Sequence, residues 1–115
     1  MTRDRALMAQ VIEREMKRHP EIRGRKSRLA HRADVTRTTL DSALDPEKWE
    51  RTSSGTYNAI EIGLELPPDT LNLIGLHDWG ALRLEGVSAD VIDWARRRTN
   101  PENPRNHRAG KGEAV

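Results

Sequence analysis

At 115 residues, a third of them charged and none of them Phe, the chain has material for one small domain whose core is filled mostly by leucines. The absence of Cys excludes disulfides and thiolate metal sites. No apolar run approaches the roughly 18 residues that span a bilayer, so the sequence predicts a cytoplasmic protein without membrane contact.

The net charge of +2 conceals a strong segregation along the chain. Residues 17–37 hold 8 Lys and Arg against 2 Asp and Glu, whereas residues 52–95 hold 1 against 7. A concentrated basic block is the electrostatic footprint of a phosphate-binding face, and its alternative is an ordinary solvated surface. We therefore expect one face of the protein to bind a polyanion and another not to.

Apolar spacing and polar caps predict an all-α fold. Five apolar residues at helical spacing between Leu7 and Met16 indicate a first helix over residues 4–18, which ends before Pro20. Further helices are predicted over residues 26–33, 36–44, 54–65, 70–76 and 88–98. Residues 77–87 alternate weakly, which favours a short extended segment or a loop.

The same pattern predicts three regions. Residues 1–76 form one helical domain, and residues 77–98 form a C-terminal extension with a helix that packs on the domain or mediates dimerisation. Trp79 and Trp94 lie in that extension, either as core anchors or as part of a dimer interface. Residues 99–115 form a basic tail with almost nothing to bury, which predicts disorder in the free protein.

Residues 27–44 are typical of a helix-turn-helix. Ala30 supplies the small side chain that two closely crossing helices need. Asp34 stands where the turn requires a residue that tolerates positive φ, while Leu40 and Ala43 face inward from the second helix. The sequence therefore predicts that residues 1–76 are a helix-turn-helix DNA-binding domain, in which the second helix of this motif enters a major groove.

The outward residues of that second helix are the base-reading candidates. Arg37 is the strongest, because a guanidinium can bond O6 and N7 of guanine together. Thr38 and Ser42 can bond bases or contact a thymine methyl group. Asp41 either accepts from a cytosine amine or orients Arg37 across one helical turn, and the sequence favours the orienting role.

Phosphate contacts are expected from the residues around both helix starts. Thr36 and Thr39 lie at the start of the second helix, where free N–H groups favour anions. The remaining candidates flank the motif on either side and are Arg25, Lys26, Ser27, Lys48 and Arg51. For each of these cations, an ordinary solvated charge is the alternative.

The segment Arg28-Leu-Ala-His-Arg-Ala-Asp-Val-Thr-Arg-Thr-Thr-Leu40, followed by Thr56-Tyr-Asn-Ala-Ile-Glu-Ile-Gly-Leu-Glu-Leu66, resembles the lambda-repressor-like Cro/C1-type (XRE) helix-turn-helix family, in its actinobacterial or actinobacteriophage form. The resemblance covers about residues 22–75. It implies a compact bundle of about five helices. It also implies a transcriptional regulator, usually a phage-type repressor or Cro-like protein, that binds double-stranded operator DNA, commonly as a homodimer. The chain departs from the family pattern at Asp34, where glycine is usual, and at Leu44-Asp45-Pro46, which replaces Glu-x-Gly.

Other chemistry finds little support in the sequence. His19, His31, His77 and His107 share no metal-ligand spacing, and no nucleophile setting or glycine-rich phosphate loop is present. We therefore expect a non-enzyme without cofactor or metal. Two alternative functions remain: an antitoxin-like or other protein-interaction module with secondary DNA binding, and a recombination-directionality or architectural DNA-binding factor.

Overall fold

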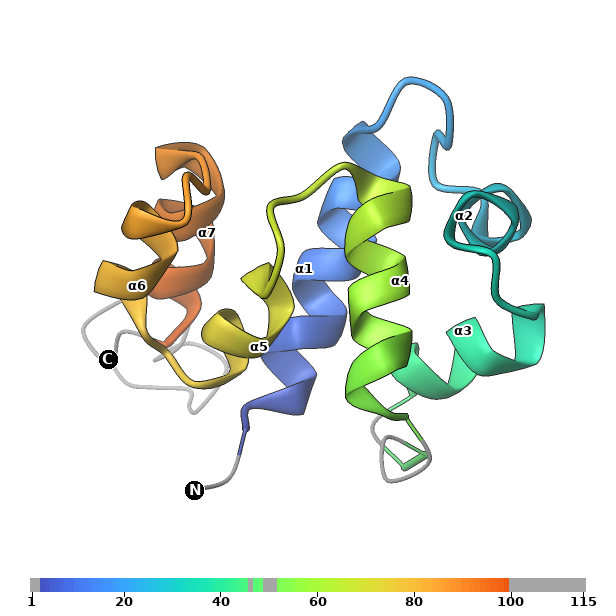
Figure 1. The fold of residues 1–115 in the computed structure, drawn as a ribbon, viewed down its shortest axis with the longest axis horizontal. Coiled ribbons are helices and arrows are strands. Elements are labelled where there is room, and N and C mark those ends of the chain that lie inside the picture. Colours follow the sequence, from blue (N-terminus) through green and yellow to red (C-terminus); the bar gives the residue numbers. More distant parts are fainter. Residues whose placement is uncertain (1–2, 46, 49–51, 100–115) are drawn as a thin grey trace, which may run out of the picture.

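The computed structural model describes residues 3–45, 47–48 and 52–99, and it confirms the predicted all-α class. Within these residues the chain forms seven helices and no strand (Figure 1). The helices are α1 (Arg5–Arg18), α2 (Lys26–Ala33), α3 (Arg37–Leu44), α4 (Ser54–Leu64), α5 (Thr70–Gly75), α6 (Trp79–Leu84) and α7 (Ala89–Thr99). The predictions for Arg51 and for the tail beyond residue 99 lie outside the described residues.

Polar side chains fix where several helices begin. The carboxylate of Asp4 accepts the N–H of Leu7 at 3.0 Å at the start of α1. Thr36, Ser53 and Asp78 each accept from the backbone three residues ahead, at the starts of α3, α4 and α6. Each cap satisfies one of the N–H groups that a helix start leaves without an internal partner.

Residues 77–87 are a correction to the sequence prediction, because they contain helix α6 rather than an extended segment or a loop throughout. Asp78 caps this helix by accepting the N–H of Ala81 at 3.1 Å. Leu82 is fully buried, whereas Leu84 is 89% exposed. The apparent alternation was misleading because these two leucines, two positions apart, lie on different faces of a short helix.

The core joins both ends of the molecule through α1. This helix contacts α3, α4, α5 and α7, and it lies near the middle of the view in Figure 1. Helices α2 and α3 lie at one end of the longest axis, and α6 and α7 lie at the other. The largest fully buried hydrophobic side chains are Val11, Met8, Ile12, Ile22, Leu29, Leu40, Ile60, Leu71, Ile74, Leu82 and Ile92. Trp79 and Trp94 pack against this cluster while remaining partly exposed.

None of the helices in the described ranges is both long enough and apolar enough to cross a bilayer.

Candidate nucleic-acid interface

The turn between α2 and α3 has the geometry that the sequence predicted. Asp34 has a φ of 58° and a ψ of 44°, which is the left-handed region. The N–H of Val35 donates to the carbonyl of Ala30 at 3.0 Å and so closes the end of α2. This six-to-one hydrogen bond around a left-handed residue is a common way of ending a helix, and Asp is among the few residues other than glycine that tolerate it.

A close approach of two helices fixes the position of α2. A Cβ atom placed on Gly63 of α4 would lie 3.0 Å from the backbone nitrogen of Ala33 and 3.2 Å from its Cα. A side chain at this position would require the backbone of α2 to move by a few tenths of an ångström, so the close approach favours glycine. Sequence reasoning missed Gly63, although a lone glycine inside a predicted helix was a signal of such a contact.

Arg32 strengthens the same contact from the side. Its Nε donates to the carbonyl oxygen of Gly63 at 2.9 Å, and its Nη2 donates to Oε2 of Glu65 at 2.7 Å. Glu65 ends α4 in the left-handed region and also lies 2.8 Å from Nε2 of His19, at the end of α1. The hydrogen bond from His19, followed by its charge, lowers the pKa of the Glu65 carboxyl. These contacts join the ends of α1, α2 and α4.

Two threonines at the start of α3 form hydrogen bonds with each other. Oγ1 of Thr36 accepts the N–H of Thr39 at 3.0 Å, and the two hydroxyl oxygens lie 2.8 Å apart. Thr36 is exposed, whereas Thr39 is half-buried. Both were expected to contact phosphate, and the structure places them together as the cap of α3, with Thr36 the more accessible.

The four base-reading candidates differ in exposure. Arg37 and Thr38 are exposed, whereas Asp41 and Ser42 are half-buried. Nε of Arg37 lies 3.3 Å from Oδ1 of Asp41, so the predicted contact across one turn is present. Nζ of Lys26 lies 3.8 Å from the same oxygen. A single carboxylate therefore faces one cation from each helix of the motif.

The residues expected to contact the DNA backbone lie before and after the two helices of the motif. Arg25 and Ser27 are exposed at the start of α2, which has no side-chain cap, and Lys48 is exposed in the turn after α3. Arg28 is a further exposed cation that sequence reasoning did not select. It lines a surface groove together with Ser27 and His31. Its place on α2, one position beyond Ser27, was the available signal.

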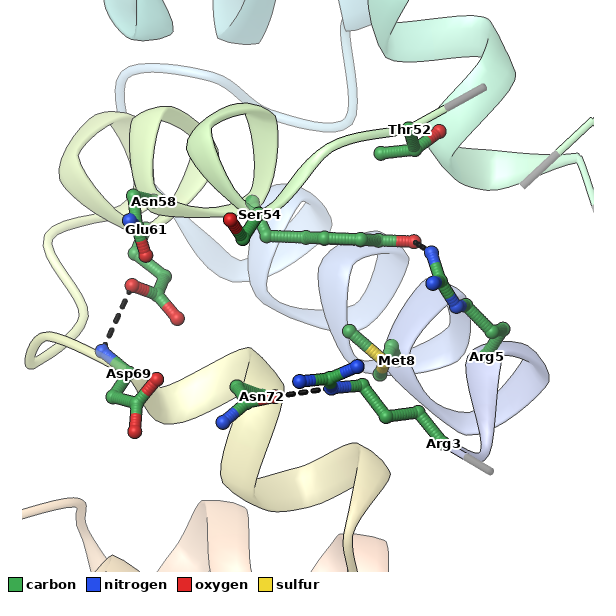
Figure 2. A pocket seen from close by; sticks show the side chains of 10 residues that line it. Arg3, Arg5, Met8, Thr52, Ser54, Asn58, Glu61, Asp69 and Asn72 are labelled. Carbon is green, nitrogen blue, oxygen red and sulfur yellow. Dashed lines mark hydrogen bonds between the residues drawn. The ribbon is translucent and has the colours of Figure 1, made fainter. Parts of the chain in front are cut away.

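A separate pocket of about 160 Å³ lies between α1, α4 and α5 and uses no residue of α2 or α3. Figure 2 shows Glu61 on its wall, with the carboxylate accepting the N–H of Asp69 at 3.0 Å. The same carboxylate accepts the N–H of Leu71 at 2.7 Å and so caps α5 from another helix. Burial raises the pKa of Glu61, and these two hydrogen bonds partly oppose the shift. Sequence reasoning missed this structural role.

The structure brings no three metal-ligating side chains together in the ranges it describes. No known protein family, curated protein or solved structure matches this chain. Assignment of function therefore depends on the residues of this chain alone.

Proposed function

We propose that the protein is a sequence-specific, double-stranded DNA-binding regulator of transcription whose helix α3 enters the major groove. The observation that carries the proposal is the outer face of the motif formed by α2 and α3. There, Arg37 and Thr38 are exposed on a short helix that begins with a satisfied cap. A helix of this kind presents side chains from its first turns to base edges.

Electrostatics support the same assignment. Arg25, Lys26 and Arg28 lie at the start of α2, beside α3, and α2 begins without a side-chain cap. Such a helix start binds phosphate oxygens favourably, because its free N–H groups carry partial positive charge. The acidic residues of the segment 52–95 belong to other elements. The positive charge is therefore concentrated on one part of the surface, as expected for a protein that binds DNA from one side.

Asp41 supports recognition of a specific base sequence through its contact with Arg37. A guanidinium that recognises guanine must hold its two donors in one plane toward O6 and N7. The contact between Asp41 and Nε of Arg37 limits the orientations of that guanidinium. In the proposed complex the two terminal nitrogens of Arg37 bond guanine. In the proposed complex Thr38 and Ser42 contact neighbouring bases, and Lys26, Ser27 and Lys48 contact phosphates.

The proposal includes the finer assignments that the family resemblance implies. The protein acts in the cytoplasm as a repressor or Cro-like regulator of phage type, binds its operator as a homodimer and needs no cofactor. A dimer places two copies of α3 about one turn of DNA apart, which predicts a nearly palindromic operator.

The test is selection of bound sequences from randomised duplex DNA, followed by affinity measurements over a salt series. We expect an enriched motif whose preference falls about tenfold in Arg37→Ala, since a bidentate contact contributes about 1–3 kcal/mol of discrimination. Lys26→Ala should weaken binding to all sequences equally and reduce the salt slope by about one. Arg83→Ala on α6 is the control for loss of one exposed cation. No enrichment, or equal effects of Arg37→Ala and Arg83→Ala, would contradict the proposal.

A further inference from the structure

A second cationic groove lies between α1 and α7, outside the interface described above. It has a volume of about 390 Å³. Its lining residues come from these two helices and are Gln10, Glu13, Arg14, Lys17, Arg18, Trp94 and Arg98. On α1 the positions 10, 14 and 18 are four residues apart, as are positions 90, 94 and 98 on α7. Each set therefore lies along one helix face, and the α1 set extends over about 12 Å.

Trp94 contacts two of the cations that line this groove. The guanidinium carbon of Arg98 lies 4.1 Å from the centroid of the Trp94 ring, and that of Arg14 lies 5.2 Å from it. Both distances are within the range of cation–π attraction. The tryptophan therefore holds two guanidinium groups from different helices beside the groove, which reduces the entropy lost when they bind a ligand.

Arg14 and Arg18 already bind an oxyanion from within the chain, beside the groove. Oδ2 of Asp90 lies 2.5 Å from Nη2 of Arg14 and 3.3 Å from Nη1 of Arg18. The hydrogen bond from Arg14 is the main reason why the pKa of Asp90 is lowered. Glu13 and Glu15 are the other carboxylates on this part of α1, and Glu15 also contacts Arg14. The four cations that line the groove, Arg14, Lys17, Arg18 and Arg98, outnumber these three carboxylates.

The groove is far from α3. In Figure 1, α7 lies at one end of the longest axis and α3 at the other, with α1 and α4 between them. In the proposed complex, the duplex bound by α3 lies at the opposite end of the longest axis from this groove. Whatever occupies the second groove is therefore a separate segment or a separate molecule.

We propose that the groove between α1 and α7 binds the phosphate backbone of a second nucleic-acid duplex segment, so that one chain holds two segments at once. The proposal rests on the proposed function for its first segment. Guanidinium groups predominate in the groove, and their planar forks match phosphate oxygens in pairs. The lining cations come from two helices, and the α1 face of the groove extends over about 12 Å, which fits a repeating polyanion better than a single small anion.

The test is a bridging assay with the full chain. One duplex is immobilised, the protein is bound to it, and capture of a second, fluorescent 20-base-pair duplex of random sequence is measured. The double variant Lys17→Gln/Arg98→Gln should reduce capture of the second duplex at least fivefold and leave retention on the first within twofold. The control Arg3→Gln/Arg83→Gln removes two cations elsewhere and should retain capture. Absence of capture by the wild-type chain, or equal capture by both double variants, would overturn the proposal.

A second readout separates this proposal from the proposed function. Titration of the full chain with the short duplex should shift the NMR signal of the Trp94 indole N–H, in the wild type and in Arg37→Ala alike. A chain that shows this shift without any sequence preference retains the second groove while the proposed function fails. Displacement of the second duplex by poly-glutamate at the same charge concentration would overturn the choice of nucleic acid and assign the groove to an acidic protein segment.

Discussion

Nε of Arg37 lies 3.3 Å from Oδ1 of Asp41, one turn further along α3, and Lys26 of α2 approaches the same oxygen. This carboxylate stands on the surface that we assign to DNA, where a negative charge opposes binding. In the proposed complex, Asp41 therefore contributes to recognition by orienting Arg37.

The first prediction concerns that orientation. Asp41→Asn should raise affinity for random duplex DNA about twofold, because one repulsive charge is lost. It should also reduce the preference for the selected sequence, because Arg37 is no longer held by an ionised partner. Competition between selected and random duplexes measures both effects. Glu47→Gln removes a charge from the nearby turn and should leave the preference intact; an equal loss of preference in Glu47→Gln would refute the orienting role.

The second prediction concerns the contact between α2 and α4. Gly63→Ala should destabilise the protein by about 1–3 kcal/mol, because the new methyl group meets the backbone of Ala33. Gly80→Ala on α6 is the matched control, since a Cβ at that position meets nothing within 4 Å. It should stabilise by up to about 1 kcal/mol through helix propensity. Urea denaturation of both variants tests the opposite signs, and two effects of the same sign would contradict the packing argument.

The third prediction concerns the left-handed turn. Asp34→Gly should stabilise the protein by about 0.5–1 kcal/mol, because glycine reaches a φ of 58° without a Cβ penalty and this gain exceeds its entropic cost. Asp34→Ala should instead destabilise, because alanine has no polar group to ease the strained backbone. Thermal unfolding ranks the three proteins, with the glycine variant expected first and the alanine variant last.

The fourth prediction concerns Glu61 and pH. Burial raises the pKa of this carboxyl in the folded chain above its ordinary value of 4.5. Between the unfolded and the folded pKa, the folded state binds more protons, so the contribution of Glu61 to stability falls as pH rises through that window. In Glu61→Gln this fall disappears. Urea denaturation of both proteins at a series of pH values above 4.5 gives the difference, and parallel curves would show that Glu61 does not titrate in this way.

Local signals predicted much of the fold. Thr36 was recognisable as the start of the second helix of the motif, His19-Pro20 as a helix end and Asp34 as the left-handed turn, because each depends on a few neighbouring residues. Helix α6 was missed for the converse reason. Its short length left too few apolar positions for a clear period, and only the packing of Leu82 against the rest of the core shows which face is inward.

The candidate site was likewise predicted only in part from the sequence. The sequence predicted that Arg37 and Thr38 face outward, and the helical spacing was sufficient for this. Periodicity alone did not predict that Glu61 is buried, since its burial depends on the N–H groups of Asp69 and Leu71 from a later segment. The groove beside Trp94 depends on two helices more than seventy residues apart, so no local pattern reveals it.

The contact between Gly63 and Ala33 has a consequence for recognition. It fixes α2 against α4 through a backbone surface that carries none of the proposed base-reading residues. In the proposed complex, exchange of Arg37 and Thr38 for other side chains changes the preferred operator while the packing beneath them stays the same. Under the proposed function, substitutions that alter operator preference are therefore separate from the contacts that maintain the stability of the scaffold.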